Sequence, residues 1–192
     1  HPLPLLDRHR HDTSLFEELD QKQRELGLMH DDRPFSPFLR PYFLERSRYD
    51  RIRAAAAELN RAFESMTAAA LEYDEIMTAL GMSGKEARWA RIEPGYPGVS
   101  LNSRFDTFLS GAGFAFLEYN AENPAGIGDQ PSLESLYSNV PAVQEFLANN
   151  DHYYPRPEVK LLDALVSGYR DFGGKKVKPN IAIVDWEGVS TT

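Results

Sequence analysis

Four polar residues in two short motifs are the best candidates for chemistry in this sequence: Arg104 and Asp106 in the first motif, Glu118 and Asn120 in the second. Side chains alternate between the two faces of a β-strand, so the members of each motif share a face if both motifs lie in strands. Two carboxylates and an amide oxygen on one patch suit a hard cation, above all Mg²⁺. The sequence therefore predicts a magnesium site at Asp106, Glu118 and Asn120, with Arg104 beside it.

The segment between the motifs predicts a β-hairpin. Gly111-Ala112-Gly113 is interpreted as a three-residue turn, which pairs Ser110 with Phe114. In that register the two carboxylates stand opposite each other, as do the Arg and the Asn of the motifs. Phe114 and Phe116 then lie on the same face as the second motif. Like charges directly opposite one another destabilise a sheet, and a bound cation would relieve that repulsion.

The same residues are also consistent with an ordinary solvated hairpin face, on which Arg104 neutralises either carboxylate. The segment that follows favours a site, because residues 121–128 are rich in turn-forming types. Binding sites are often built from strand ends and the loops that leave them.

The order of these motifs resembles the circularly permuted ATP-grasp ligases, most closely the glutathionylspermidine synthase-like branch. The shared pattern is Arg-x-Asp, then Glu-x-Asn with its Glu twelve residues after the Asp, then a Pro-containing turn. The match covers residues 99–146, with a weaker one at 173–186. In that family the Asp, Glu and Asn hold Mg²⁺ ions that bridge the ATP phosphates. The resemblance thus implies Asp106, Glu118 and Asn120 as metal ligands, Arg104 as the catalytic cation, and Mg²⁺ and ATP as cofactors.

The resemblance also implies an activity: the ligation of a small-molecule or peptide carboxylate to an amine or a thiol, through an acyl phosphate. The residues that grip ATP in this family come later in the chain, so this N-terminal fragment is expected to be inactive alone. In the glutathionylspermidine branch a Thr or Ser follows the Pro of the turn, whereas this chain has Ala125-Gly126 there. Glutathione and spermidine are therefore not implied as substrates. A non-catalytic nucleotide- or peptide-binding module is the alternative, and a metal-dependent hydrolase is a third interpretation.

Composition limits the other classes of protein. The 192-residue chain has a net charge of −8, and 42% of its residues are hydrophobic, as in ordinary globular proteins. It shows no basic face of the kind that binds nucleic acid. The absence of cysteine excludes disulfides, thiolate nucleophiles and Cys-ligated zinc. No apolar run approaches the roughly 18 residues of a membrane span, and no signal peptide is visible. A cytoplasmic protein without nucleic-acid or membrane partners is expected.

The order of elements predicts an α/β fold, with α+β as the alternative. A helical region over residues 1–98 is followed by an α/β region over 99–192, which carries the hairpin in a mixed sheet. The resemblance implies that this region is an incomplete part of a permuted ATP-grasp fold. The turn-rich residues 93–98 mark the boundary. Helical periodicity and end signals predict helices over 14–29, 42–71 and 72–80, after Ser83, over 131–149 with a break at Pro141, and over 157–173.

Two further expectations concern burial. The apolar stripe of the long helix predicts that Ile52, Leu59, Phe63 and Met66 are buried, while its arginines are solvated. Residues 180–186 are apolar and are predicted to form a strand in the interior of a sheet.

Overall fold

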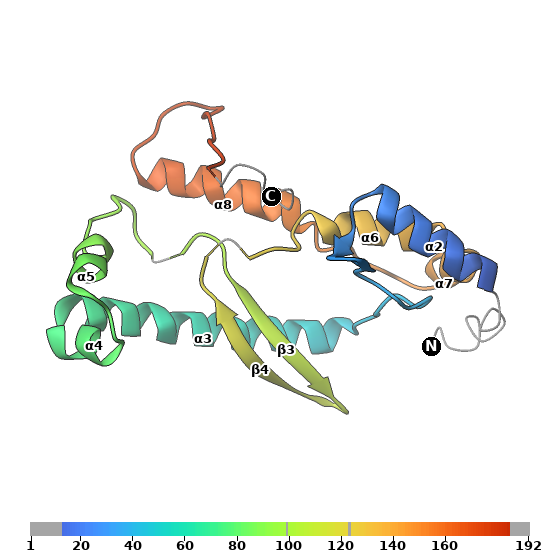
Figure 1. Ribbon diagram of the computed structural model, residues 1–192, viewed down its shortest axis with the longest axis horizontal. Coiled ribbons are helices and arrows are strands. Elements are labelled where there is room, and N and C mark those ends of the chain that lie inside the picture. The colour runs from blue at the N-terminus through green and yellow to red at the C-terminus, as the bar shows by residue number, and fades with distance from the viewer. Residues whose placement is uncertain (1–12, 99, 123, 185–192) are drawn as a thin grey trace. The chain divides into compact units, whose positions relative to one another are not determined.

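The computed structural model describes residues 13–98, 100–122 and 124–184 (Figure 1). The described part has seven helices and two small antiparallel sheets of two strands each, so the fold is mixed α/β with a helical N-terminal half. The chain divides into two compact units. One combines the residues up to Phe43 with Ala125–Leu161, and the other combines Leu44–Pro124 with the residues from Leu162 onward. The boundary expected at residue 98 lies inside the second unit.

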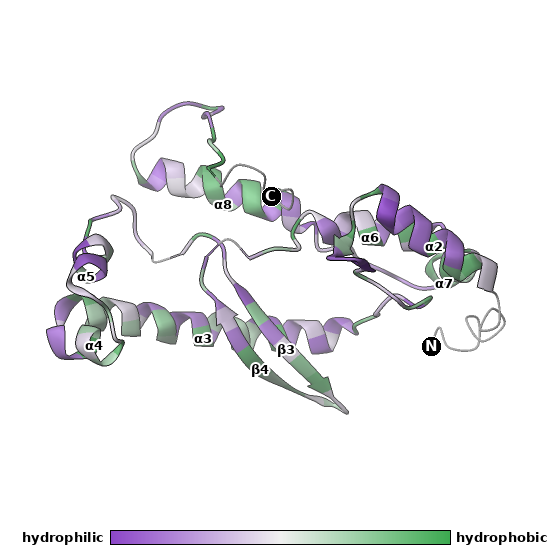
Figure 2. Cartoon of the chain, in the orientation of Figure 1, coloured by the Kyte–Doolittle hydropathy of each residue, from purple (hydrophilic) through white to green (hydrophobic). Residues whose placement is uncertain are grey.

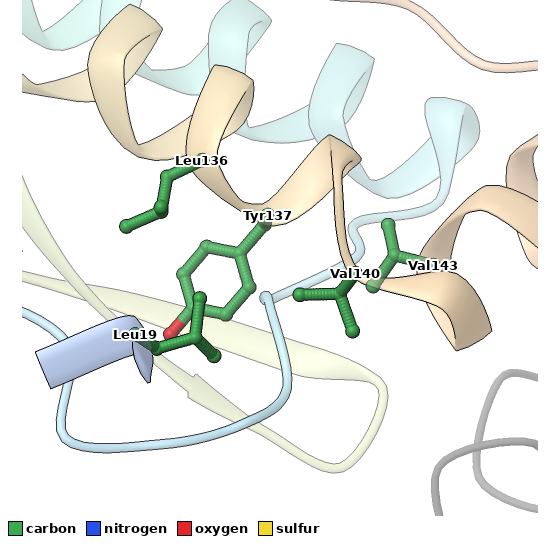
Figure 3. Packing of buried hydrophobic residues seen from close by; sticks show 5 residues of the cluster. All are labelled: Leu19, Leu136, Tyr137, Val140 and Val143. Carbon is green, nitrogen blue, oxygen red and sulfur yellow. The ribbon is translucent and has the colours of Figure 1, made fainter. Parts of the chain in front are cut away.

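The first unit is built around a small core between three helices. Its elements are α2 (Thr13–Glu25), β1 (Met29–His30), β2 (Arg33–Pro34), α6 (Asp129–Ser138), α7 (Pro141–Ala148) and the first turn of α8 (Pro157–Asp171). α2 is mostly hydrophilic, so only a narrow stripe of it faces the core (Figure 2). The core cluster is made of Leu19, Leu136, Tyr137, Val140 and Val143 (Figure 3).

Proline separates α6 from α7. Pro141 occupies the first position of α7, where its missing N–H is not needed for a helical hydrogen bond. Val140, just before it, is extended and only 2% exposed, so the break itself contributes to the core. The break expected at Pro141 is therefore confirmed.

Gln23 is the only buried polar residue among those that the structure describes, at 1% exposure. Its side-chain amide binds the backbone of Ser36 twice: Oε1 accepts from Ser36 N at 2.9 Å, and Nε2 donates to Ser36 O at 3.0 Å. The Tyr137 hydroxyl lies 2.6 Å from Ser36 Oγ and donates to the Phe38 carbonyl. Burial raises the pKa of Tyr137, and the hydrogen bond with Ser36 opposes this rise. Side chains thus fix residues 36–38.

The second unit contains a long helix and the predicted hairpin. Its elements are α3 (Arg46–Glu72), α4 (Asp74–Ala79), α5 (Gly84–Ala90), β3 (Arg104–Ser110), β4 (Gly113–Asn120) and the rest of α8. The helix predicted after Ser83 is α5, and Ser83 and Glu86 form a capping box at its start. Tyr73 has extended backbone, with φ −110° and ψ 117°, and this interrupts the helix between α3 and α4.

The prediction of a fully buried stripe on α3 is wrong. Met66 is 55% exposed and Phe63 is 36% exposed, while Ile52 and Leu59 are only half-buried. The arginines are not all solvated either, because Arg48 is half-buried against the hairpin turn. The stripe therefore serves to pack a narrow hairpin, which covers less of the helix than a full layer would.

The prediction of a strand over residues 180–186 is also wrong for residues 180–184, which the structure describes. Residues 180–184 lie in no strand, and Ile183 and Val184 are 83% and 92% exposed. Apolar composition favours a strand only when a neighbouring strand can pair with it, and no described strand pairs with this segment. Residues 185 and 186 lie outside the described part of the chain.

Candidate functional site

The pairing of β3 with β4 brings the four predicted site residues onto one face of the hairpin. Asp106 is directly opposite Glu118, and Arg104 is directly opposite Asn120. Residues paired in this way point to the same face. Arg104 Nε donates to Asp106 Oδ1 at 2.7 Å, and Asn120 Nδ2 donates to Glu118 Oε1 at 3.0 Å. The structure thus has the pairing that the sequence predicts, while the role of these residues stays a prediction.

The turn that produces this pairing differs from the predicted one. Ser110 pairs with Gly113, so the turn has two residues, Gly111 and Ala112. Gly111 has φ +51°, a value that suits glycine in a tight hairpin turn. Pairing is then one residue out of the predicted register until Leu117, which has no partner on β3 and forms a β-bulge. The bulge restores the predicted register just before the carboxylate pair.

The bulge also changes which face two phenylalanines occupy. Phe114 pairs with Leu109 and Phe116 pairs with Thr107, so both phenylalanines lie on the face opposite Glu118. The prediction that they share the face of the second motif is therefore wrong. Alternation along a strand holds only within an unbroken ladder, and one extra residue inverts it.

The back of the site is packed against α3. Phe105 and Tyr119 alternate with the four site residues and pair across the strands, with ring centroids 4.7 Å apart. Phe63 of α3 stacks on Tyr119 at 4.5 Å and 7°. The Tyr119 hydroxyl donates to Asn60 Oδ1 at 3.1 Å, and Asn60 Nδ2 donates to Glu64. These contacts hold the strand segments that carry the site residues.

The other end of the hairpin is held by arginines. Arg48 Nη2 donates to the carbonyl of Gly113, and Arg51 Nη2 donates to that of Ala112 at 3.4 Å. Turn carbonyls cannot all be satisfied within a hairpin, so these guanidinium groups supply the missing donors. Both side chains therefore link α3 to the turn, with Arg48 half-buried and Arg51 still exposed.

The donor set fits a magnesium ion that also binds phosphate. Mg²⁺ in phosphate-transfer sites is held by one or two carboxylates, with substrate phosphates and water as the remaining ligands. Asp106 accepts a hydrogen bond from Arg104 through one carboxylate oxygen, and Glu118 accepts one from Asn120 in the same way, so each carboxylate has a second oxygen on the same face of the hairpin. Within the described ranges, no group of three or more His, Asp or Glu side chains is arranged to hold a metal. Any ion bound here would therefore need further ligands in addition to the two carboxylates.

Sequence reasoning missed Asn60, Tyr119 and the two hairpin-binding arginines. One feature of the sequence could have indicated Asn60: it is a polar residue adjacent to the apolar stripe, one turn before Phe63. No local pattern could have indicated the roles of Arg48 and Arg51, because their acceptors are backbone carbonyls more than 60 residues away.

Comparisons with known proteins give no family assignment. The chain matches no protein-family model, no curated protein and no solved structure at a significant level. Among the described helices, none combines the length and the apolar character needed to cross a membrane. The resemblance to permuted ATP-grasp ligases therefore depends on sequence motifs, chiefly those around the hairpin.

Proposed function

We propose that this chain is part of an ATP- and Mg²⁺-dependent ligase that joins a carboxylate to an amine or a thiol. The observation that supports the proposal is the pairing of Asp106 with Glu118 and of Arg104 with Asn120 on the hairpin face turned away from α3. A β-bulge immediately beside the carboxylate pair adds support, because bulges are common next to active sites, where they re-aim side chains.

In the proposed reaction the substrate carboxylate attacks the γ-phosphorus of ATP, and ADP leaves to give an acyl phosphate. The amine then attacks the acyl carbon, loses a proton, and expels inorganic phosphate. Asp106, Glu118 and Asn120 would hold Mg²⁺, which neutralises charge on the phosphate oxygens. Arg104, held beside Asp106 at 2.7 Å, would stabilise negative charge on the transferring phosphoryl group.

A non-catalytic nucleotide- or peptide-binding module is the second candidate. The observation that favours it is the exposure of the hairpin face, where the side chains of Arg104 and Asp106 are 43% and 37% exposed. Charges in such an open position interact through water, so each interaction with a ligand is several-fold weaker than it would be in a closed cleft. A cytoplasmic location, with no nucleic-acid partner, belongs to both versions of the proposal and is supported by the acidic, cysteine-free composition.

Metal binding is tested first, with Mn²⁺ as a paramagnetic probe and Mg²⁺ as its competitor. The chain is expected to bind one Mn²⁺, which Mg²⁺ displaces. Asp106→Asn and Glu118→Gln should each abolish this binding, while Glu93→Gln, an exposed carboxylate of the same unit, should not. Binding unaffected by the two hairpin substitutions would refute the site.

Ligase chemistry is tested with hydroxylamine, which traps an acyl phosphate as a hydroxamate. A longer protein containing this chain is expected to form hydroxamate and ADP only when a carboxylate substrate is present, and Arg104→Gln should abolish both products. ADP formed without any carboxylate would indicate a hydrolase. Nucleotide binding without ADP formation would indicate the binding module. The chain by itself is expected to release no phosphate from MgATP, and Asp106-dependent turnover would contradict that expectation.

A further inference from the structure

A cavity of about 400 Å³ lies in the first unit, apart from the hairpin, and we call it the α2 cavity. One wall is a single face of α2, with Phe16, Leu19, Asp20 and Gln23 at helical spacing. The other wall is His30 together with residues 33–38. Its volume falls within the roughly 300–1,000 Å³ of small-molecule sites.

The lining is largely apolar and aromatic. Phe16 and Phe35 are 43% and 38% exposed, and Phe38 is 70% exposed. Pro34 and Pro37 complete the wall. Three rings around one hollow form a surface that prefers to stack with a ring-bearing ligand.

The cavity is also preformed. Its second wall is fixed at Ser36, whose N–H and C=O both bind the Gln23 amide and whose hydroxyl binds Tyr137. Phe35 N donates to Leu28 O at 3.0 Å, which fixes the start of the same segment. A wall that is already ordered costs little conformational entropy when a ligand binds.

The charges at the cavity leave one cation available. Asp20 is paired with Arg24 at 2.7 Å, and His30 lies 3.2 Å from Asp31. Arg33 lines the cavity, and its guanidinium has no hydrogen-bond or ion-pair partner among the described residues. A guanidinium presents two parallel N–H donors, which match the two oxygens of a carboxylate.

We propose that the α2 cavity binds a small aromatic carboxylate. Its ring lies among Phe16, Phe35 and Phe38, and its carboxylate binds the Arg33 guanidinium. This site does not depend on the hairpin or on the ligase activity proposed above.

The test uses two probes that share a phenyl ring on a three-carbon chain but carry opposite charges, 3-phenylpropionate and 3-phenylpropylamine. The reporter is the anionic dye 8-anilinonaphthalene-1-sulfonate. The dye is expected to bind the whole chain with one-to-one saturation and a rise in fluorescence. The carboxylate should displace it and the amine should not. Dye binding at many equivalent sites, or equal displacement by both probes, would overturn the proposal.

Two matched pairs of variants locate the site. Phe38→Ala should weaken 3-phenylpropionate binding roughly three- to tenfold, because a wall of the hollow is removed. Tyr42→Ala, which removes an equally exposed ring of the same unit, should leave binding unchanged. Arg33→Gln should weaken binding roughly two- to fivefold, as for an exposed ion pair, while Arg40→Gln should have no effect. All four side chains are exposed, so folding is expected to survive each change. Equal effects of a variant and its control would refute the assigned position.

Discussion

Deleting Leu117 should leave the β3–β4 hairpin almost as stable as it is now. Leu117 is the bulged residue, so its removal lets Phe116 pair with Thr107 and Glu118 pair with Asp106 in one unbroken ladder. Every other side chain of the hairpin keeps its face. The aromatic contacts with α3 and the carboxylate pair are therefore both retained.

The expected change in free energy can be worked from the exposure of the deleted side chain. Leu117 is 62% exposed, so it contributes only a fraction of the 1.5–3 kcal/mol of a fully buried leucine, about 1 kcal/mol or less. Closing the ladder restores regular hydrogen bonding worth about 0.5–1.5 kcal/mol. The two effects oppose each other, and the net change in the free energy of opening the hairpin should lie within about 1 kcal/mol of zero.

Deleting Ala115 is the matched control. It also shortens β4 by one residue, but a regular ladder then places Leu117 opposite Thr107 and moves Phe116 to the outer face. Phe116 would lose its packing against Phe105 at 5.1 Å and Phe114 at 5.6 Å. Each aromatic pair contributes about 0.5–1.5 kcal/mol, so this deletion should destabilise the hairpin by about 1–3 kcal/mol.

Hydrogen–deuterium exchange of peptides covering residues 104–120 measures local opening directly. Protection in the Leu117 deletion should stay within roughly fivefold of the parent chain, and it should fall by roughly ten- to a hundredfold in the Ala115 deletion. Equal loss of protection in the two deletions would show that Leu117 is not an unpaired residue and that the pairing described for β4 is incorrect.

Three further outcomes concern buried contacts and are measured by urea unfolding. Tyr137→Phe should cost about 1–2 kcal/mol through the lost hydroxyl bonds. This deficit should shrink above about pH 10, where the raised pKa of Tyr137 makes the parent chain lose stability as the unfolded phenol ionises, and a constant deficit would contradict the burial of that hydroxyl. Gln23→Leu should cost about 2–4 kcal/mol by leaving both backbone groups of Ser36 unsatisfied, and a loss below 1 kcal/mol would show that water replaces the amide. Gly168→Ala would place its new Cβ 2.8 Å from Leu101 Cδ1, but Leu101 is 37% exposed and its side chain can move, while alanine favours the helix by about 1 kcal/mol, so the net change should lie within about 1 kcal/mol of zero. With Leu101→Ala already present the contact is gone, so Gly168→Ala should then stabilise α8 relative to its effect in the parent chain, and simple additivity would refute the close contact.

The parts of the fold that local chemistry determines could be predicted from the sequence. The capping box at Ser83 and the helix break at Pro141 depend on the residue itself and its neighbours within one turn. The pairing of Asp106 with Glu118 was also predicted, but from a three-residue turn that does not exist. The two-residue turn and the bulge at Leu117 offset each other, so the predicted pairing held only in the half of the hairpin nearest the site.

What could not be predicted depends on contacts between distant segments. The position of the bulge decides whether Phe114 and Phe116 face α3, and that preference arises from Phe63 and Phe105, which no local pattern connects to them. The exposure of Met66 has the same origin, because helical periodicity identifies an apolar stripe but not how far along the helix a partner extends.

The two attachments of the hairpin to α3 impose a common length on both elements. Arg48 binds Gly113, and Asn60 binds Tyr119. Twelve residues of helix rise about 18 Å, and six residues of strand extend about 20 Å, so the two spans nearly match. One residue inserted into α3 between these points would turn Asn60 by about 100° relative to Arg48, and both attachments could no longer form together. A change of length in either element therefore requires a compensating change in the other.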